Sequence, residues 1–577
     1  MMIDSLFYSI WRNNFIRYLI RTRVCQDLVI DVDLQYLNDN GQYLSLLTLQ
    51  SQRTSSSNIF IKLEIRNTNE FMQYINHTHR YLINYLVISH KIDMSSLNQT
   101  KDSNNNNNQK QKRSNSNNSN GISRIDFHLI PEGVERLRLT VAKETTGCGA
   151  LPESVTQLEV YRVGWDRIKS DFINKVLLPN LPPQLVSLTL DDGFKIQTAQ
   201  PCVIPSNMRR FKHMSTYDSF ACLVPPPNKV LGDSVLEIRC YEALEWLAGN
   251  KSIVNVLYNI NAKLKQLPAH VCGLEIKRQD IKMEMDTLPP SILSLRCYSN
   301  HLFTNPFVLG RSNLKHLSLQ QYHDKLERGI LPNTLESLEI NFYNMPLDPG
   351  VFSSSLKSLS LETFDQDLCL GVLPQSLINL RLFRFNKPLR SSVLPNRLEN
   401  LNLYNYNQTL PCNSLPRSLV HVQLDSYNRS FQAVGPLDHL ESLMVNSINK
   451  SLSLLLANTK NIAITFFQFN YDQDIIDDAC TTPTTTATDM DVCLTNNPIE
   501  TLSLCYYGPK FNLSGNLLPR TLKHLTMYNV NINSAGIIPS GCVYLKADIS
   551  DSNIGFIPTS VKYIIKNKYQ NPIDEGY

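Results

Sequence analysis

The sequence shows no large excess of one charge and no long apolar run. Its 577 residues include 55 Lys and Arg against 51 Asp and Glu, which gives a formal net charge of +4. This balance is not that of a dedicated nucleic-acid-binding protein, so we expect no nucleic-acid partner. No stretch reaches the roughly 18 apolar residues that a membrane-spanning helix requires, so we expect no membrane span.

The 13 cysteines are scattered and include no C-x-x-C pair, which argues against both a zinc ribbon and a disulfide framework. This usage predicts a reducing compartment, the cytoplasm. The sequence also lacks the motifs G-x-x-x-x-G-K-[ST], G-x-G-x-x-G, H-E-x-x-H and G-x-S-x-G. We therefore expect no enzyme activity, no cofactor and no metal site.

Two groups of side chains come nearest to a metal site. His77 and His79 could face one side of a strand, but no nearby Cys or carboxylate set completes their ligands. Surface histidines are the simpler interpretation of this pair. Cys480 and Cys493 share a segment with several aspartates, and here a metal cluster stays open as an alternative to a plain loop.

The first part of the chain differs from the rest. Residues 4–23 carry apolar side chains at helical spacing with arginines between them, which predicts an amphipathic helix. This helix could pack on the domain that follows, or contact a membrane surface or a partner. Alternation at Phe60–Ile65 and Tyr85–Ile88 predicts strands. We assign residues 1–97 to the helix and to irregular capping coils, and the Asn-rich residues 98–121 to a disordered loop.

A ten-residue phrase, L-P-x-S/T-L-x-x-L-x-L, recurs along the chain. Its clearest copies read LPNTLESLEI, LPQSLINLRL, LPNRLENLNL, LPRSLVHVQL and LPRTLKHLTM. Repeat starts fall at 310, 331, 352, 373, 394, 415 and 436, at equal intervals of 21 residues. Less even copies on both sides give about 18 units over residues 122–577. An acidic, Thr-rich stretch at about 472–496 interrupts the series, and we expect it to be a disordered insertion.

The spacing inside one unit predicts its structure. Apolar residues two positions apart, such as Leu380 and Leu382, alternate as in a strand with one buried face. The Pro of the phrase belongs in the turn before the strand, where the Ser or Thr after it can bond local backbone. A unit this short buries its apolar face only by stacking. We therefore predict a β-rich solenoid, a leucine-rich-repeat-like parallel sheet of about 18 coils with a short N-terminal helical segment.

A second signature follows the strand in each unit. An aromatic or aliphatic residue is followed by Asn, as in FNKPL, YNMPL and YNQTL. The first residue should point to the core, and the Asn should stack with its equivalents into a largely buried ladder bonded to backbone. A surface row of polar ligands is the alternative. The row comprises Asn344, Asp365, Asn386, Asn407, Asn428 and Asn449.

The combination of L-P-x-S-L-x-x-L-x-L with F-N-x-P-L resembles the FNIP repeat, a leucine-rich-repeat relative that is abundant in social amoebae. The segment LFYSIWRNNFIRYLI also resembles the N-terminal segment of many of those proteins. The repeat resemblance covers most of the chain after the Asn-rich segment. It implies a binding scaffold, and it implies a fold more specifically than it implies an activity.

The outward positions of the predicted strands suggest a binding surface. They alternate with the buried leucines, and stacking aligns them between coils. In three consecutive coils they bring together Arg381, Phe383, Tyr404 and His421, and exposed aromatics beside Arg are typical of binding hot spots. A solvated face with incidental aromatics is the alternative interpretation.

These observations lead to two functional hypotheses. The first is a non-catalytic interaction scaffold whose sheet face binds a protein partner, which the sequence does not identify. The second is an adaptor that recruits substrates to a ubiquitin ligase through its N-terminal segment, since some relatives of the repeat family carry an F-box. The opening here lacks the L-P-x-E start of an F-box. The sequence gives no indication of an oligomeric state.

Overall fold

The computed structural model describes most of the repeat region and part of what precedes it. The predicted helix at 4–23, the Asn-rich segment and nearly all of the insertion at 472–496 lie outside the described residues. The described ranges are 28–48, 59–94, 123–164, 167–260, 266–277, 289–298, 306–469, 494–508, 511–513, 517–550 and 553–566.

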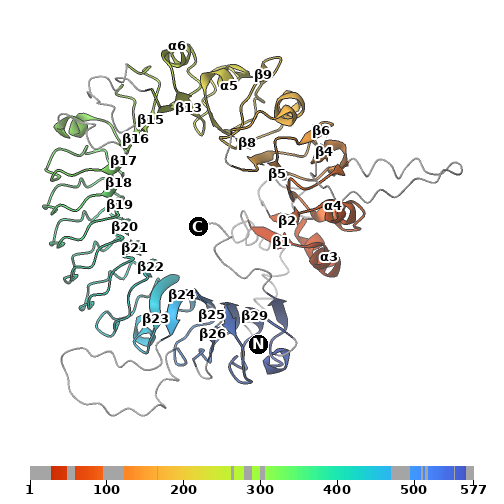
Figure 1. The fold of residues 1–577 in the computed structure, drawn as a ribbon. Coiled ribbons are helices and arrows are strands. Elements are labelled where there is room, and N and C mark those ends of the chain that lie inside the picture. The colour runs from red at the N-terminus through yellow and green to blue at the C-terminus, as the bar shows by residue number, and fades with distance from the viewer. Residues whose placement is uncertain are drawn as a thin grey trace, which may run out of the picture. The chain divides into compact units, whose positions relative to one another are not determined.

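The chain divides into two compact units. The first unit comprises residues 1–260 with 267–274, and the second comprises residues 261–266 with 275–577. Each unit is built on parallel strands that follow one another in chain order, and Figure 1 labels these strands along each stack. The predicted parallel solenoid is therefore confirmed for the described residues.

The first unit contains a seven-stranded parallel sheet. The two strands predicted before the Asn-rich segment are present with the bounds expected from their alternation. They pair with each other in parallel, and the second of them pairs in parallel with Arg136–Val141, after that segment. The sheet therefore begins before the first recognisable repeat. Its strands are β1 (Val29–Val32), β2 (Phe60–Ile65), β3 (Tyr85–Ile88), β5 (Arg136–Val141), β7 (Gln157–Arg162), β8 (Ser187–Leu190) and β10 (Arg210–Lys212).

Short elements fill the connections of the first unit. Asn67 accepts a hydrogen bond from the backbone N–H of Glu70 at 3.0 Å, and Glu70 accepts one from the backbone N–H of Arg66 at 2.8 Å. This reciprocal cap satisfies free donors at the start of α4. The helices are α3 (Leu34–Thr48), α4 (Thr68–Ile75), α5 (Tyr217–Ala221), α6 (Tyr241–Gly249) and a π-helix at Phe172–Leu177. The remaining strands are β4 (Arg124–Asp126), β6 (Thr146–Cys148), β9 (Cys202–Val203), β11 (Met214–Ser215), β12 (Leu223–Val224), β13 (Val235–Ile238) and β14 (Asn255–Tyr258).

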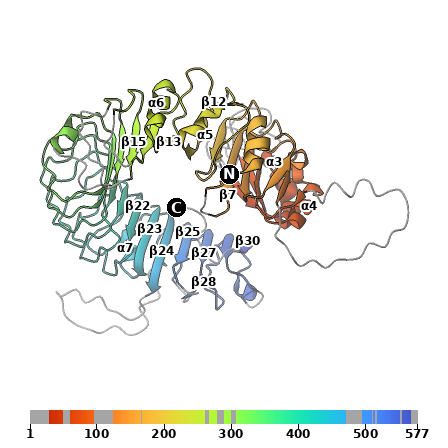
Figure 2. The same cartoon turned by 45° about the horizontal axis from the view of Figure 1, so that its top comes forward.

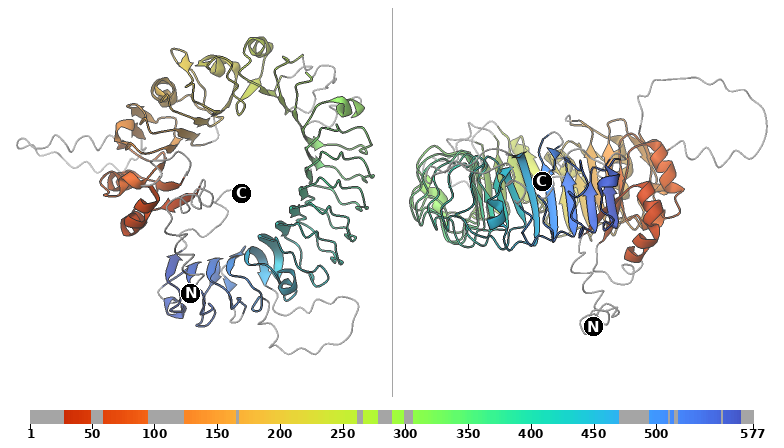
Figure 3. Two further views of the ribbon diagram at one scale, coloured as in Figure 1. Left: turned by 180° about the vertical axis from the view of Figure 1, so that it is seen from behind. Right: turned by 90° about the horizontal axis from the view of Figure 1, so that it is seen from below.

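In the second unit a strand begins six residues after each evenly spaced repeat start. Figure 2 labels several of these strands side by side, and the right-hand view of Figure 3 shows the cyan and blue strands lengthwise, next to one another. β15 (Gly273–Ile276) precedes them in the sequence. The evenly spaced strands are β17 (His316–Gln321), β18 (Ser337–Phe342), β19 (Ser358–Leu361), β20 (Asn379–Arg381), β21 (Asn400–Asn402), β22 (His421–Leu424) and β23 (Ser442–Ile448). The other strands of this sheet in the second unit are β16 (Ser294–Cys297), β24 (Asn461–Phe469), β25 (Thr501–Tyr506), β27 (His524–Tyr528), β29 (Tyr544–Ala547) and β30 (Tyr563–Lys566).

Few helical segments interrupt the second unit. α7 (Leu452–Leu455) precedes β24, and β26 (Phe511–Asn512) pairs with β28 (Val530–Asn531) beside the main sheet. Over the described ranges no helix is both long enough and apolar enough to cross a membrane.

Rows of identical positions form the core of the second unit. Leu338, Leu359, Leu380 and Leu401 occupy one register position in four successive strands and are at most 2% exposed. Each such leucine contributes on the order of 2–5 kcal/mol relative to Ala. The predicted strand leucines therefore form one continuous apolar column.

A second buried column consists of aromatic rings. Tyr343, Phe364, Phe385, Tyr406 and Tyr427 are at most 1% exposed. Neighbouring rings in this column are nearly parallel, and their centroids are 6.1–6.4 Å apart. Burial raises the pKa of Tyr406 to about 12, so its hydroxyl keeps its proton and donates to the backbone carbonyl of Thr409 at 3.3 Å.

The Ser and Thr of the repeat phrase behave differently from the prediction. Their hydroxyls do not cap their own turn but donate to a carbonyl of the preceding coil. Ser376 bonds the carbonyl of Leu356 and Ser418 bonds that of Leu398, each at 2.6 Å. The reason is stacking, which places the previous coil's carbonyl nearer than a local acceptor. The hydroxyl is thus a bond between coils.

The turn before each repeat start requires a left-handed residue. Two residues before the start, the backbone has positive φ in five consecutive coils, at Gly329, Gly350, Gly371, Ser392 and Asn413. Glycine adopts this region without a Cβ penalty, whereas other residues do so at a cost of about 1–2 kcal/mol. The repeat is therefore constrained at a position that the sequence phrase does not include.

Replacing Gly371 with Ala should lower the free energy of unfolding by about 1 kcal/mol, because Ala resists positive φ. No atom lies within 4 Å of the added Cβ, so the loss isolates backbone strain. Gly232→Ala is the matched control, since its Cβ also meets open space and its φ is not positive. Urea denaturation measures both variants, and equal losses would contradict the φ argument.

Replacing Ser418 with Ala should cost about 1 kcal/mol, because the carbonyl of Leu398 loses its donor. Arg397 occupies the same position in the intervening coil and is exposed, so Arg397→Ala serves as the control. The unfolding free energies are compared by chemical denaturation. A Ser418→Ala variant as stable as the control would show that the bond between coils is energetically neutral.

Candidate binding surfaces and a charged pocket

The predicted patch lies on the outward face of strands β20, β21 and β22. Parallel pairing aligns Arg381 with Asn402 and then with Gln423, and it aligns Asn400 with His421. Arg381 and His421 are exposed. They therefore lie in neighbouring rows of the same face, two coils apart.

Phe383 and Tyr404 form the centre of this patch. Their ring centroids are 4.3 Å apart and the rings are within 9° of parallel. The guanidinium carbon of Arg381 lies 6.0 Å from the centroid of Phe383, within the range of a cation–π interaction. The structure thus brings three of the four predicted residues into contact. His421 shares the face, but no ring contact or hydrogen bond joins it to the other three.

Asp425 occupies the position of Tyr404 in the next coil. The backbone pairing shows this equivalence: the N–H of Asn405 donates to the carbonyl of Phe383, and the N–H of Ser426 donates in the same way to the carbonyl of Tyr404. Alternation predicts an outward side chain at this position, yet Asp425 is only 7% exposed. Its Oδ2 atom has no hydrogen-bond partner among the described residues. Burial raises the pKa of its carboxyl group, and the hydrogen bond with Gln423 opposes this effect.

The Asn row forms a ladder of hydrogen bonds to backbone. The side-chain oxygen of Asn344 accepts from the N–H of Asp365 at 2.8 Å, that of Asp365 from Asn386 at 2.9 Å, and that of Asn386 from Asn407 at 2.9 Å. The oxygen of Asn407 accepts from the N–H of Asn428 at 3.3 Å. Each coil therefore supplies an acceptor to the coil after it.

The last residue of the row makes a different contact, and the row is less buried than expected. Asn449 donates from Nδ2 to the carbonyl of Arg429 at 3.3 Å. Asn344, Asn386 and Asn428 are exposed, and the other three members are half-buried. Burial was the wrong expectation because the row lies at the end of the strand, one residue beyond the buried aromatic column.

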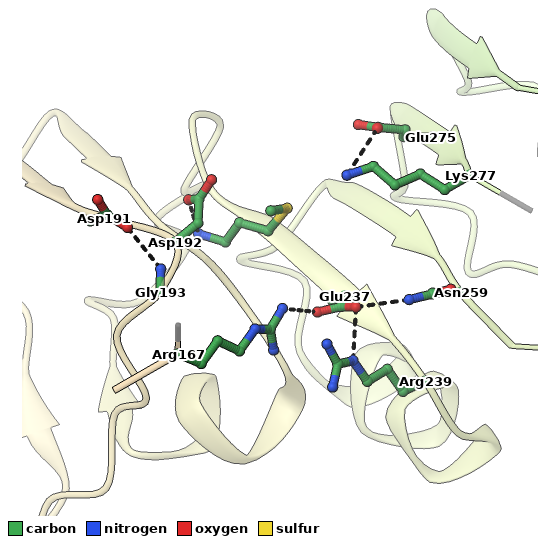
Figure 4. A network of polar contacts seen from close by, with 10 residues as sticks. Arg167, Asp191, Asp192, Gly193, Glu237, Arg239, Asn259, Glu275 and Lys277 are labelled. Carbon is green, nitrogen blue, oxygen red and sulfur yellow. Dashed lines mark hydrogen bonds and ion pairs between the residues drawn. The ribbon is translucent and has the colours of Figure 1, made fainter. Parts of the chain in front are cut away.

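The first unit contains a polar network that the sequence did not indicate. Glu237 on β13 is 3% exposed and binds three side chains, as Figure 4 shows. Arg167 Nη2 lies 2.5 Å from Oε2, and Arg239 Nε lies 2.8 Å from Oε1. Asn259 Nδ2 donates to Oε1 at 2.9 Å. A buried carboxylate thus holds two partly exposed guanidinium groups.

The network keeps Glu237 charged. Burial alone raises the pKa of its carboxyl group, but hydrogen bonds from Arg239, Arg167 and Asn259 outweigh burial and lower the pKa to about 2. Below neutral pH, the carboxylate therefore keeps holding both guanidinium groups until strongly acidic conditions are reached. The carboxylate of Glu237 is buried, whereas the guanidinium groups of Arg167 and Arg239 are partly exposed to solvent.

A pocket of about 480 Å³ opens beside this network. The residues that line it come from the Arg167–Lys169 segment, the loop after β8, β11 with the start of α5, and β13 with the residue before α6. They are Arg167, Ile168, Lys169, Phe194, Lys195, Ser215, Thr216, Tyr217, Asp218, Glu237, Arg239 and Cys240.

A wider hollow of about 1140 Å³ lies in the second unit, at the start of the strands. Its charged lining consists of Arg397, Arg417 and Lys460 against Glu399, Asp438 and Glu441. Asp438 also accepts a hydrogen bond from Asn458 at 2.7 Å. The balanced charge of this hollow favours no ligand of one sign.

The candidate metal ligands do not form a site in the described part of the chain. The His77 and His79 rings are 6.0 Å apart, and no group of three or more His, Cys, Asp or Glu side chains there could hold a metal ion. Cys480 and Cys493 lie outside the described residues.

Comparison with known proteins identifies the repeat. Residues 343–383 and 385–427 match the family model described as FNIP Repeat. The chain contains FNIP repeats. The two matched segments start at Tyr343 and Phe385 of the buried aromatic column, and the second ends at Tyr427. The FNIP repeats therefore coincide with the most regular coils, which carry both the Asn row and the Phe383–Tyr404 patch.

The solved structures to which the chain with the FNIP repeats is similar include two of low sequence identity. One is the crystal structure of CroV588, described as a novel circular LRR protein, with 18% identity over 89% of this chain and 82% of that chain, and a TM-score of 0.32. The other is YopM from Yersinia enterocolitica WA-314, with 17% identity over 76% of this chain and 88% of that chain, and a TM-score of 0.29. No curated protein matches the chain.

Replacing Asn386 and Asn407 together with Leu should lower the free energy of unfolding by about 1 kcal/mol for each lost bond, because two backbone N–H groups lose their acceptors. Their partial exposure lets water replace some of this loss. Asn396→Leu, at an exposed position of the intervening turn, controls for the added apolar surface. Thermal unfolding measures both variants, and an unchanged melting temperature in the double variant would contradict a stabilising role for the row.

Proposed function

We propose that this chain is a non-catalytic protein-interaction scaffold and that a partner docks on the sheet face around Phe383 and Tyr404. The repeat solenoid supports the general role, because stacked coils form an extended surface whose outward residues are free to vary. The observation that carries the proposal is the stacked pair with Arg381 beside it. Tyr and Arg are enriched among the residues that dominate interface energies.

The geometry lowers the entropic cost of binding at this patch. The two rings are half-buried and fix each other at 4.3 Å, so they lose little rotamer freedom when a partner covers them. The partner surface that fits has an apolar or aromatic centre. It also has a carboxylate for Arg381, which is exposed beside the ring pair.

The cysteines bear on where such a scaffold works. All ten cysteines in the described ranges are free thiols, and Cys202, Cys297 and Cys542 are buried. This supports the proposal of a reducing compartment, the cytoplasm. The adaptor hypothesis concerns the N-terminal segment, whose first 27 residues lie outside the described ranges.

The double variant Phe383→Ala/Tyr404→Ala should fold normally and lose its partner. Neither ring belongs to the buried aromatic column, and truncating hot-spot aromatics costs roughly 2 kcal/mol or more in binding, about 30-fold in Kd. Affinity purification of the full chain followed by mass spectrometry identifies the partner, and calorimetry with the purified partner measures the loss.

Leu370→Ala is the control for this experiment. Leu370 is 70% exposed and lies in a turn rather than on the sheet face, so its truncation removes apolar surface without touching the patch. Partner affinity should be unchanged in this variant. A double variant that keeps full affinity would place the partner elsewhere on the chain.

A further inference from the structure

We propose that the pocket beside Glu237 binds a phosphoryl group carried by a side chain of a partner protein. This proposal rests on the proposed scaffold function in one respect only, namely that the phosphoryl group is carried by a partner protein. The pocket lies within the first unit, and every residue that lines it falls between Arg167 and Cys240.

Charge is the first argument for this ligand. Arg167, Lys169, Lys195 and Arg239 line the pocket, against two carboxylates, those of Asp218 and Glu237. The excess of two positive charges matches a phosphoryl dianion, which carries about −1.5 to −2 at neutral pH. The hollow in the second unit, in contrast, has equal numbers of cations and carboxylates.

Backbone pairing places three of the cations on one wall. Ile168 pairs with Phe194 in a parallel bridge, and both side chains are at least nine-tenths buried. Alternation then directs the neighbours Arg167, Lys169 and Lys195 away from the core and toward the pocket. Lys169 and Lys195 are exposed, and neither forms an ion pair with a described residue. Their ammonium groups are therefore available to an anion.

Glu237 positions the two guanidinium groups. Each uses one nitrogen on the buried carboxylate, and an arginine side chain has five N–H donors. Neither guanidinium makes another hydrogen bond to a described residue, so donors stay free on both. A planar guanidinium whose orientation is fixed binds phosphate with two parallel hydrogen bonds. A pair of lysines alone would not supply this geometry.

A hydroxyl in the lining and the size of the pocket also fit a small charged group. Thr216 lines the pocket just before α5, and its side chain makes no capping hydrogen bond to that helix. The volume of about 480 Å³ lies within the roughly 300–1,000 Å³ of ordinary ligand pockets. A phosphorylated side chain can therefore enter with part of its own stem.

Isothermal titration calorimetry of the full chain with O-phosphoserine, inorganic phosphate and serine tests the proposal. O-phosphoserine and phosphate should bind saturably, and serine should not bind. In the double variant Lys169→Ala/Lys195→Ala the affinity for O-phosphoserine should fall at least tenfold. Both lysines are exposed and make no ion pair with described residues, so this variant should fold like the parent chain by circular dichroism.

Lys143→Ala/Lys251→Ala is the matched control, because both lysines are exposed, neither lines the pocket, and the loss of net charge is the same. This variant should bind O-phosphoserine like the parent chain. Equal losses in the two double variants, or no saturable binding, would overturn the site. Binding of inorganic phosphate with exclusion of O-phosphoserine would overturn the assignment to a side chain. Phe383→Ala/Tyr404→Ala should leave O-phosphoserine binding unchanged, which separates this proposal from the sheet-face proposal.

Discussion

Parallel backbone pairing between successive coils is the interaction on which the other features depend. It fixes neighbouring strands at about 4.8 Å and thereby places each residue beside its equivalent 21 positions away, as with Leu359 and Leu380. Any side chain that recurs in the repeat then becomes a column. The leucine and aromatic columns supply the buried apolar surface, which one unit alone could not enclose.

The polar columns provide hydrogen-bond partners for backbone groups that lie outside the sheet. Turns leave backbone groups outside the sheet ladder, and each such group needs a partner. The Asn row supplies an acceptor to the next coil, as from Asn386 to Asn407, and the Ser or Thr row supplies a donor to the preceding coil, as from Ser418 to Leu398. Both rows act between coils and not within one turn. The repeat phrase is therefore a set of contacts between neighbours, and this accounts for its regular spacing.

The regular coils were predictable from the sequence because one rule, a strand six residues after the repeat start, holds across them. The rule failed where the repeat decays: β13 begins two residues early, and β14 and β24 have no recognisable repeat phrase. The outward position of Arg381, Phe383, Tyr404 and His421 was predictable from alternation. The burial of Asp425 was not, because it depends on neighbouring side chains. The pocket was not predictable, since Arg167 and Glu237 are 70 positions apart and belong to unevenly spaced coils.

Regularity and irregularity therefore contribute different kinds of surface. Where the period is constant, outward positions can change without disturbing the columns, so an aromatic pair such as Phe383 and Tyr404 arises on an unaltered scaffold. Where the period lengthens, the extra residues form helices and loops beside the strand ends, as α5 and α6 do next to Glu237. The pocket beside Glu237 belongs to the second arrangement, since its lining comes from the segments between unevenly spaced strands. Under the two proposals made above, the even coils would hold a protein contact and the uneven coils a small charged group.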